Sequence, residues 1–247
     1  MKKEGWKKIL IGVLSAVVAV TSFGIWRHQR TVQAINIISV RLPGRQLILD
    51  AGHGGEDGGA VSVTGVPESG INLSIVLKMD QLLGFCGVEP VLLRDSDTSL
   101  HDAEADTLRK KKVSDLHNRV SVIEGTENAL VVSIHQNTFS NPAYHGCQVF
   151  YRPGEESLTL AVLVQDTVRT ALDPANKRTP TQISDSVYLM KHITCPAVLV
   201  ECGFLSNAPE EAKLRSEGYQ TQMALCVTSA VMRSGKINGG GENDPVL

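Results

Sequence analysis

Four residues of this 247-residue chain have side chains suited to binding a metal ion and moving a proton: His53, Glu68, His135 and Glu201. Two neutral imidazoles and one carboxylate make a three-ligand zinc site that leaves a position open for water. A further carboxylate beside that water supplies a general base. These residue types together predict a metallohydrolase that cleaves an amide.

The segment around His53 is rich in glycine. His53 lies in Asp50-Ala-Gly-His-Gly-Gly55, and further glycines follow closely. Glycines let the backbone turn sharply and keep side-chain bulk away from a metal or substrate. A phosphate-binding loop is disfavoured because the segment lacks the G-x-x-x-x-G-K-[ST] pattern and carries the acidic Glu56 and Asp57. A simple turn remains an alternative for this loop taken alone.

His135 and Glu201 each stand where a largely apolar run stops. A carboxylate that ends a buried strand is costly unless it is paired, solvated in a cleft or facing a metal. The alternatives are a packing role for His135 and a salt bridge from Glu201 to Arg94 or Arg119. As a general base, Glu201 would take the proton of an attacking water and pass a proton to the leaving amine.

The other reactive side chains carry weaker signals. Asn137 is a candidate to orient a ligand or contact substrate, and His192 is a candidate to line the crevice. Five cysteines are scattered without a C-x-x-C pair, and their apolar neighbours favour buried free thiols. Cys202 follows Glu201 along an expected strand and should point to the opposite face, so we do not expect it to be a ligand.

Strand and helix patterns alternate from residue 46 onward. Apolar residues at Ile71, Ile75 and Met79 have the spacing of an amphipathic helix. The expected strands are 46–50, 90–93, 129–134, 148–151 and 197–201, and the expected helices are 69–85, 115–124, 157–172 and 217–233. This alternation predicts an α/β fold with a mainly parallel sheet covered on both faces.

In such a sheet the ligand crevice lies beyond the carboxyl ends of the strands. His53 follows the first expected strand, His135 ends a central one and Glu201 ends a late one. Glu68 starts a helix, where the positive end of the helix dipole favours a carboxylate. Three of the four residues are therefore expected at one rim of the sheet.

The distribution of charge excludes one class of function. Residues 1–34 contain six basic residues and one acidic residue, and the remainder carries 18 basic and 25 acidic residues, a formal net charge of −7. An acidic body without a Lys/Arg stripe and with few aromatic residues argues against nucleic-acid binding.

The N-terminal region has the pattern of a membrane anchor. Ile9 to Trp26 is an 18-residue run without a charge, preceded by four lysines. The run is long enough to span a bilayer, and the flanking charges place the N-terminus in the cytoplasm. No small-x-small cleavage site directly follows, so an uncleaved signal anchor is favoured over a cleaved signal peptide. Both interpretations export the body of the protein.

The expected organisation follows from these patterns. Residues 1–34 form a cytoplasmic stub, the signal anchor (9–26) and a tether, and residues 35–45 form a linker. Residues 46–234 form the catalytic domain, and residues 235–247 form a flexible tail.

The motifs together resemble the zinc-dependent N-acetylmuramoyl-L-alanine amidases of the bacterial cell wall, the group called amidase type 3. The resemblance covers about residues 46–234 and keeps the family's order and spacing. The matching segments are Asp50-Ala-Gly-His-Gly-Gly55, the Glu68 site, Ser133-Ile-His-x-Asn137 and Val200-Glu-x-Gly-Phe-x-Ser-Asn207, with Arg94 and Asp115-Leu-x-x-Arg119.

The resemblance implies that His53, Glu68 and His135 bind one zinc ion per chain and that Glu201 is the catalytic acid/base. It implies cleavage of the amide between the lactyl group of N-acetylmuramic acid and the L-alanine of the stem peptide. The implied fold is a three-layer α/β sandwich with a central sheet of about six strands.

Two absences refine this expectation. Some family members insert a helix after the second histidine that blocks the zinc, but here only about ten residues separate His135 from the next strand at Gly146. We therefore expect an open cleft. The sequence also shows no repeat-type wall-binding module.

The chain consequently looks most like the membrane-anchored sporulation amidases, which act on spore cortex and lead to muramic δ-lactam. The expected partners are peptidoglycan and the membrane, and the expected location is the outer face of the cytoplasmic membrane. The sequence does not identify a protein activator. A zinc carboxypeptidase or deacetylase on the same polymer, and a non-catalytic wall-binding protein, remain alternatives.

Overall fold

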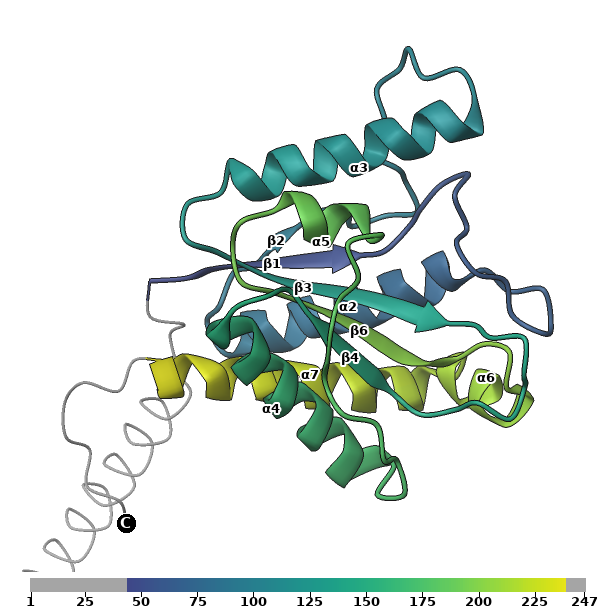
Figure 1. The fold of residues 1–247 in the computed structure, drawn as a ribbon, viewed down its shortest axis with the longest axis vertical. Helices are drawn as coiled ribbons and strands as arrows, with labels where there is room; N and C mark the ends of the chain where they lie inside the picture. Colours follow the sequence, from purple (N-terminus) through teal and green to yellow (C-terminus); the bar gives the residue numbers. More distant parts are fainter. Residues whose placement is uncertain (1–43, 239–247) are drawn as a thin grey trace, which may run out of the picture. The chain divides into compact units, whose positions relative to one another are not determined.

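A six-stranded sheet organises the part of the chain that the structure describes (Figure 1). The computed structural model describes residues 44–238. The strands are β1 (Gln46–Ala51), β2 (Val91–Leu92), β3 (Ala129–Asn137), β4 (Gln148–Tyr151), β5 (Thr181–Gln182) and β6 (Ala197–Phe204), in the order β2-β1-β3-β6-β4-β5. Every neighbouring pair is parallel except β4 with β6. The predicted mainly parallel sheet is confirmed.

Helices cover both faces of the sheet. They are α2 (Glu68–Phe85), α3 (Leu108–Glu124), α4 (Glu155–Leu172), α5 (Tyr188–His192), α6 (Ala208–Leu214) and α7 (Glu217–Asn238). Helices α2, α4 and α7 pack together on one face, and α3 and α5 lie on the other (Figure 1). The result is the predicted three-layer α/β sandwich.

Alternation along the strands explains why both faces are covered. Successive side chains of a strand point to opposite faces. In β1, Leu47 and Leu49 belong to the apolar cluster that α2, α4 and α7 complete, whereas Ile48 belongs to the cluster under α3 and α5. Strands buried on both faces need near-continuous apolar runs, and the central strands have them.

Several element boundaries differ from expectation. Helix α3 begins at Leu108, seven residues before the expected start, because Thr107 caps it by accepting a hydrogen bond from the Lys110 backbone N–H. Strands β3 and β6 each run three residues past their expected ends. The short β5, α5 and α6 were not expected, since two to seven residues are too few to show a period.

Some expectations fall outside the described residues: the anchor at 9–26, most of the linker at 35–45, and the tail from residue 239 onward. Helix α7 continues to Asn238, beyond its expected end at Arg233. Among the described residues, no helix combines the length and apolar character that a bilayer crossing requires.

Candidate metal centre

His53, Glu68 and His135 meet at the carboxyl end of the sheet. One potential ligand atom from each lies within 4.8 Å of those of the other two. His53 Nε2 is 3.1 Å from Glu68 Oε1, and His135 Nδ1 is 3.5 Å from Glu68 Oε2. The two imidazole rings are edge-to-face, with centroids 5.0 Å apart. The predicted grouping of these three residues is confirmed.

Each residue reaches the cluster from a different element. His53 follows β1, His135 lies near the end of β3, and Glu68 is the first residue of α2. His53 has a backbone φ of 62°, in the left-handed region that a non-glycine residue rarely adopts. Strain of this kind persists where surrounding contacts fix the backbone, and it concentrates at functional sites.

Two glycines allow the ligands to approach one another. A Cβ at Gly52 would lie 2.2 Å from the His135 ring. Gly59 has a φ of +70°, and a Cβ there would lie 2.4 Å from Glu68 Oε1 and 2.6 Å from His53 Cδ2. The glycine-rich loop is therefore needed for the close packing of the cluster, as its composition predicted.

Backbone and amide donors hold the buried Glu68 carboxylate. Oε1 accepts a hydrogen bond from the Ala60 N–H at 2.8 Å, and Oε2 accepts one from the Gln136 N–H at 2.8 Å. Asn72 Nδ2 donates to Oε2 at 3.2 Å. Burial alone would raise the pKa of Glu68, but hydrogen bonds and charge from the two histidines hold it well below its usual range. Glu68 is consequently an anionic ligand candidate.

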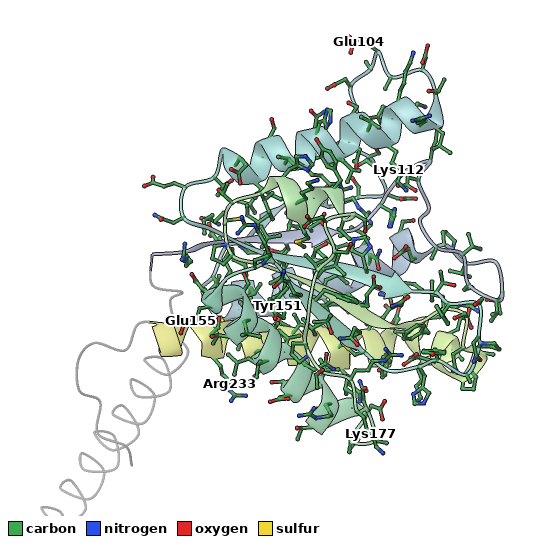
Figure 2. All side chains as sticks on the ribbon, viewed as in Figure 1. Glu104, Lys112, Tyr151, Glu155, Lys177 and Arg233 are labelled. Atoms are coloured by element: carbon green, nitrogen blue, oxygen red, sulfur yellow. The ribbon has the colours of Figure 1, made fainter. Side chains whose placement is uncertain are left out.

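Asp57 orients His53 from the side away from Glu68. Its Oδ2 lies 2.9 Å from His53 Nδ1, and Lys112 Nζ, labelled in Figure 2, lies 3.2 Å from the same oxygen. The bond to His53 keeps the pKa of Asp57 far below normal. Burial alone would lower the pKa of His53, but hydrogen bonds that its ring donates to Asp57 and Glu68 raise it to about 9. A carboxylate on the second ring nitrogen is a common support for a metal-binding histidine.

Asp57 was not singled out from the sequence as a site residue. Its position four residues after His53 brings it back to the ring only because of the loop conformation, with positive φ values at His53 and Gly55. The available signal was an acidic residue inside a glycine-rich loop that already held a ligand candidate.

Two buried arginines fix the loop's backbone. Arg94 donates from Nε to the Ala51 carbonyl at 2.8 Å and from Nη2 to the Gly52 carbonyl at 3.1 Å. Arg119 Nη2 donates to the His53 carbonyl at 2.9 Å. The salt bridge from Glu201 to Arg94 or Arg119, considered as an alternative, does not form.

Arg119 is instead neutralised by two aspartates. Its guanidinium pairs with Asp50 and, from Nε at 2.8 Å, with Asp115. Burial alone would raise the pKa of Asp50, but the Arg119 charge lowers it. Ser133 Oγ also donates to Asp50, at 2.6 Å. This polar network ties β1, β3 and α3 together beneath the cluster.

Glu201 lies directly beside His135. The two residues are register partners on the adjacent parallel strands β3 and β6. One carboxyl oxygen, Oε2, is buried without a hydrogen-bond partner. Burial raises the pKa of Glu201 to about 7, with His135 opposing and Glu68 adding to the shift. A carboxyl group with a pKa near neutral is suited to both accepting and donating a proton.

A cavity of about 220 Å³ opens beside the cluster. Its walls include His53 and His135 of the cluster and Tyr188 and Leu189 of α5. His192 does not line it, so that prediction is wrong: its ring stacks on Tyr188, with centroids 3.9 Å apart, and bonds to the Tyr188 carbonyl. Because His192 follows Tyr188 by one helical turn, its side chain packs against Tyr188 of the same helix.

The donor set fits a zinc ion. Two imidazole nitrogens and one carboxylate oxygen are a zinc-type ligand set with room for a further ligand, and the orphaned oxygen of Glu201 lies beside it. Cys202, one residue from Glu201, is buried and bonds to the Val200 carbonyl. The predicted exclusion of Cys202 agrees with this geometry. The five cysteines are free thiols as expected, but only Cys147, Cys202 and Cys226 are buried, whereas Cys86 and Cys195 are partly exposed.

The fold and the site are those of a metal-dependent hydrolase. Residues 47–233 match the family model Amidase_3, described as N-acetylmuramoyl-L-alanine amidase. The chain belongs to this family, so it is a peptidoglycan hydrolase with N-acetylmuramoyl-L-alanine amidase activity. The resemblance inferred from the sequence is confirmed, and zinc dependence is general in the family.

Similar proteins agree with this assignment. The chain is 32% identical over 196 residues to the germination-specific N-acetylmuramoyl-L-alanine amidase of Bacillus subtilis, covering 79% of this chain and 81% of that protein. It is 36% identical to the CwlD amidase of Clostridioides difficile, whose structure was solved in complex with the GerS lipoprotein. That match has a TM-score of 0.75 and covers 78% of this chain and 99% of the other.

A further solved structure is an N-acetylmuramoyl-L-alanine amidase from Clostridium difficile 630, 27% identical with a TM-score of 0.68. The match covers 80% of this chain and 99% of that one. The likeness therefore extends over the whole of the related domain.

The close packing at Gly59 gives a testable prediction. Replacing Gly59 with alanine should abolish stoichiometric metal binding, because the new methyl group would displace Glu68 and His53. Gly65→Ala is the matched control: Gly65 also has a positive φ, +85°, but its surroundings are open. Metal content after dialysis, measured by mass spectrometry, should fall in the first variant and not in the second. Equal metal content in both would contradict this packing requirement.

Proposed function

We propose that this amidase binds zinc through His53, Glu68 and His135 and uses Glu201 as its catalytic acid/base. The observation that carries the proposal is the Glu201 carboxyl, whose Oε2 is buried without a hydrogen-bond partner and which lies in register with His135. A buried carboxyl oxygen without a partner destabilises a fold, so its presence beside a ligand cluster supports a catalytic role.

When bound, zinc supplies a Lewis acid that polarises the scissile carbonyl and lowers the pKa of water. Glu201 removes the proton of the attacking water and then delivers a proton to the amide nitrogen, which lets the stem peptide leave. Burial raises the pKa of the Glu201 carboxyl to about 7, which suits it to both transfers.

The surrounding residues position this machinery. Asp57 sets the orientation of the His53 ring through the bond to Nδ1, which leaves Nε2 directed at Glu68. The Gln136 N–H and Asn72 fix the Glu68 carboxylate. Asn137 stays a predicted substrate or ligand contact, and its backbone carbonyl accepts a hydrogen bond from the Leu205 N–H.

We extend the proposal to spore cortex, with muramic δ-lactam formation following removal of the stem peptide. Support comes from the likeness to the germination-specific amidase and to CwlD. The connection between β3 and β4, residues 138–147, contains no helix, so nothing there occupies the place of a blocking helix.

A cell-wall substrate requires an enzyme that faces the wall, and the uncharged run at 9–26 supports anchoring to the outer face of the cytoplasmic membrane. The structure of the CwlD relative contains a lipoprotein, which supports a lipoprotein partner for this chain as well.

A Glu201→Gln variant tests the catalytic assignment. Release of peptides that begin with L-alanine from purified peptidoglycan should fall at least about 100-fold, because general acid–base catalysis contributes that much. Metal content should stay at the wild-type level, since Glu201 is not among the ligands. Glu156→Gln, a partly buried glutamate on α4, is the control and should keep full activity.

Three outcomes would contradict the proposal. Full activity of Glu201→Gln would remove the assigned base. Release of D-alanine or acetate in place of L-alanine-initiated peptides would favour the carboxypeptidase or deacetylase alternatives. Wall binding without any product would favour the non-catalytic alternative.

The cortex role has a separate test in the spore-forming host. Spores that carry only the Glu201→Gln protein should lack muramic δ-lactam in their cortex, as measured by chromatography of digested muropeptides. Spores with the Glu156→Gln protein should contain the normal amount. A normal amount of δ-lactam in the Glu201→Gln spores would contradict the cortex role and indicate that the enzyme acts elsewhere in the wall.

A further inference from the structure

Three aromatic side chains gather at the end of the sheet that holds the metal cluster. Phe139 and Tyr144 have ring centroids 4.6 Å apart, and Tyr144 and Phe204 have centroids 6.2 Å apart. The described residues contain only eight phenylalanines and tyrosines in all, so this is a marked concentration. We refer to Phe139, Tyr144 and Phe204 as the aromatic platform.

The platform is half open to solvent. Phe139 is 50% exposed and Tyr144 is 45% exposed, whereas Phe204 is buried beneath them. The loop after α4, marked by Lys177 in Figure 2, carries Arg178, whose guanidinium lies 4.7 Å from the Phe204 ring centroid. Two exposed rings on an apolar base differ from a core cluster, in which every ring is covered.

Hydrogen bonds fix the loop that carries the platform. The Phe139 N–H donates to Ser206 Oγ at 3.0 Å, and Asn207 Nδ2 donates to the Pro142 carbonyl at 2.8 Å. Glu210 accepts from the Gly146 N–H at 2.8 Å. A preformed surface binds with little loss of conformational freedom.

A β-bulge turns the platform toward the catalytic side. His135 pairs with Glu201, but Asn137 pairs with Phe204, so β6 has one extra residue in this interval. Without the bulge, Phe204 would point away from the face that Glu201 occupies; the extra residue restores it to that face. Phe139 follows His135 by four residues, which limits their backbone separation to about 13 Å.

We propose that the aromatic platform binds the face of a sugar ring that adjoins the N-acetylmuramic acid under attack. The proposal rests on the proposed function, because it extends the same site along the glycan strand. The face of a pyranose presents C–H groups with slight positive charge, which complements the negative face of an aromatic ring. Arg178 lies 4.7 Å from the Phe204 centroid and 5.8 Å from the Tyr144 centroid, and its guanidinium N–H groups can donate hydrogen bonds to the hydroxyl and carbonyl oxygens of a sugar that lies on the rings.

The ring that carries the reacting lactyl group must stay next to the metal cluster and Glu201. The platform is at most about 13 Å from His135 along the chain, which is close enough for a neighbouring ring of the same glycan strand to reach it. The platform therefore distinguishes polymer from an isolated muramyl peptide.

The test uses the full-length protein with the double substitution Phe139→Ala/Tyr144→Ala. Phe85→Ala is the control. Phe85 is likewise an exposed aromatic residue, at 79%, but it lies at the opposite end of α2 from Glu68. Each protein acts on polymeric peptidoglycan and on an N-acetylmuramoyl tetrapeptide without a second sugar. For the double variant we expect KM on the polymer to rise about tenfold, with kcat and the rate on the small substrate unchanged.

Binding of peptide-free glycan strands provides a readout independent of hydrolysis. Glu201→Gln protein should bind these strands, and adding the double substitution should weaken binding about tenfold. A second result separates the two proposals. If no protein releases L-alanine-initiated peptides but this binding difference holds, the proposed catalytic function is contradicted and sugar binding by the platform is supported.

The proposal is overturned if the double variant loses activity equally on both substrates, since the loop would then only support Glu201. It is also overturned if KM on the polymer and strand binding are both unchanged. The exposed rings would then belong to a protein partner's contact surface.

Discussion

The structure of the site depends on a single buried carboxylate, that of Glu68. Three N–H donors, from Ala60, Gln136 and Asn72, hold it in place. Because these donors come from the glycine-rich loop, β3 and α2, the carboxylate joins three elements that are distant in sequence. The histidines on either side keep it ionised, and each of its oxygens in return lies beside a ring nitrogen of one of them. A metal ion placed among the three side chains would replace the histidine–carboxylate attraction with direct coordination.

The parallel sheet supplies the geometry that Glu68 uses. Register places His135 beside Glu201, so the proposed ligand and base are neighbours by strand pairing alone. Arg94 and Arg119 then bind the carbonyls at the end of β1 and hold His53 in a conformation it would not adopt unaided. The cost of burying Arg119 is offset by Asp50 and Asp115. Catalytic geometry thus rests on a polar network that lies beneath the ligands.

Much of the fold and of the candidate site could be predicted from the sequence, because the ends of buried strands can be recognised in it. Apolar runs that stop at His135 and Glu201 located both residues at one rim, and the alternation of elements gave the layers. Features that depend on backbone conformation were not visible. Asp57 reaches His53 only through a left-handed turn, and Phe204 reaches the catalytic face only through a bulge. His192 was misplaced because α5 is a single short helix without a readable period.

The most direct test of the proposed ligand set is the X-ray absorption spectrum of the zinc-loaded protein. Coordination by His53, Glu68 and His135 predicts only nitrogen and oxygen neighbours at about 2.0–2.2 Å, with imidazole scattering from two rings. Replacing Glu68 with glutamine should alter this first shell while leaving both imidazoles visible. A sulfur neighbour at about 2.3 Å would contradict the ligand set, because it would bring a cysteine into a site built from histidine and glutamate.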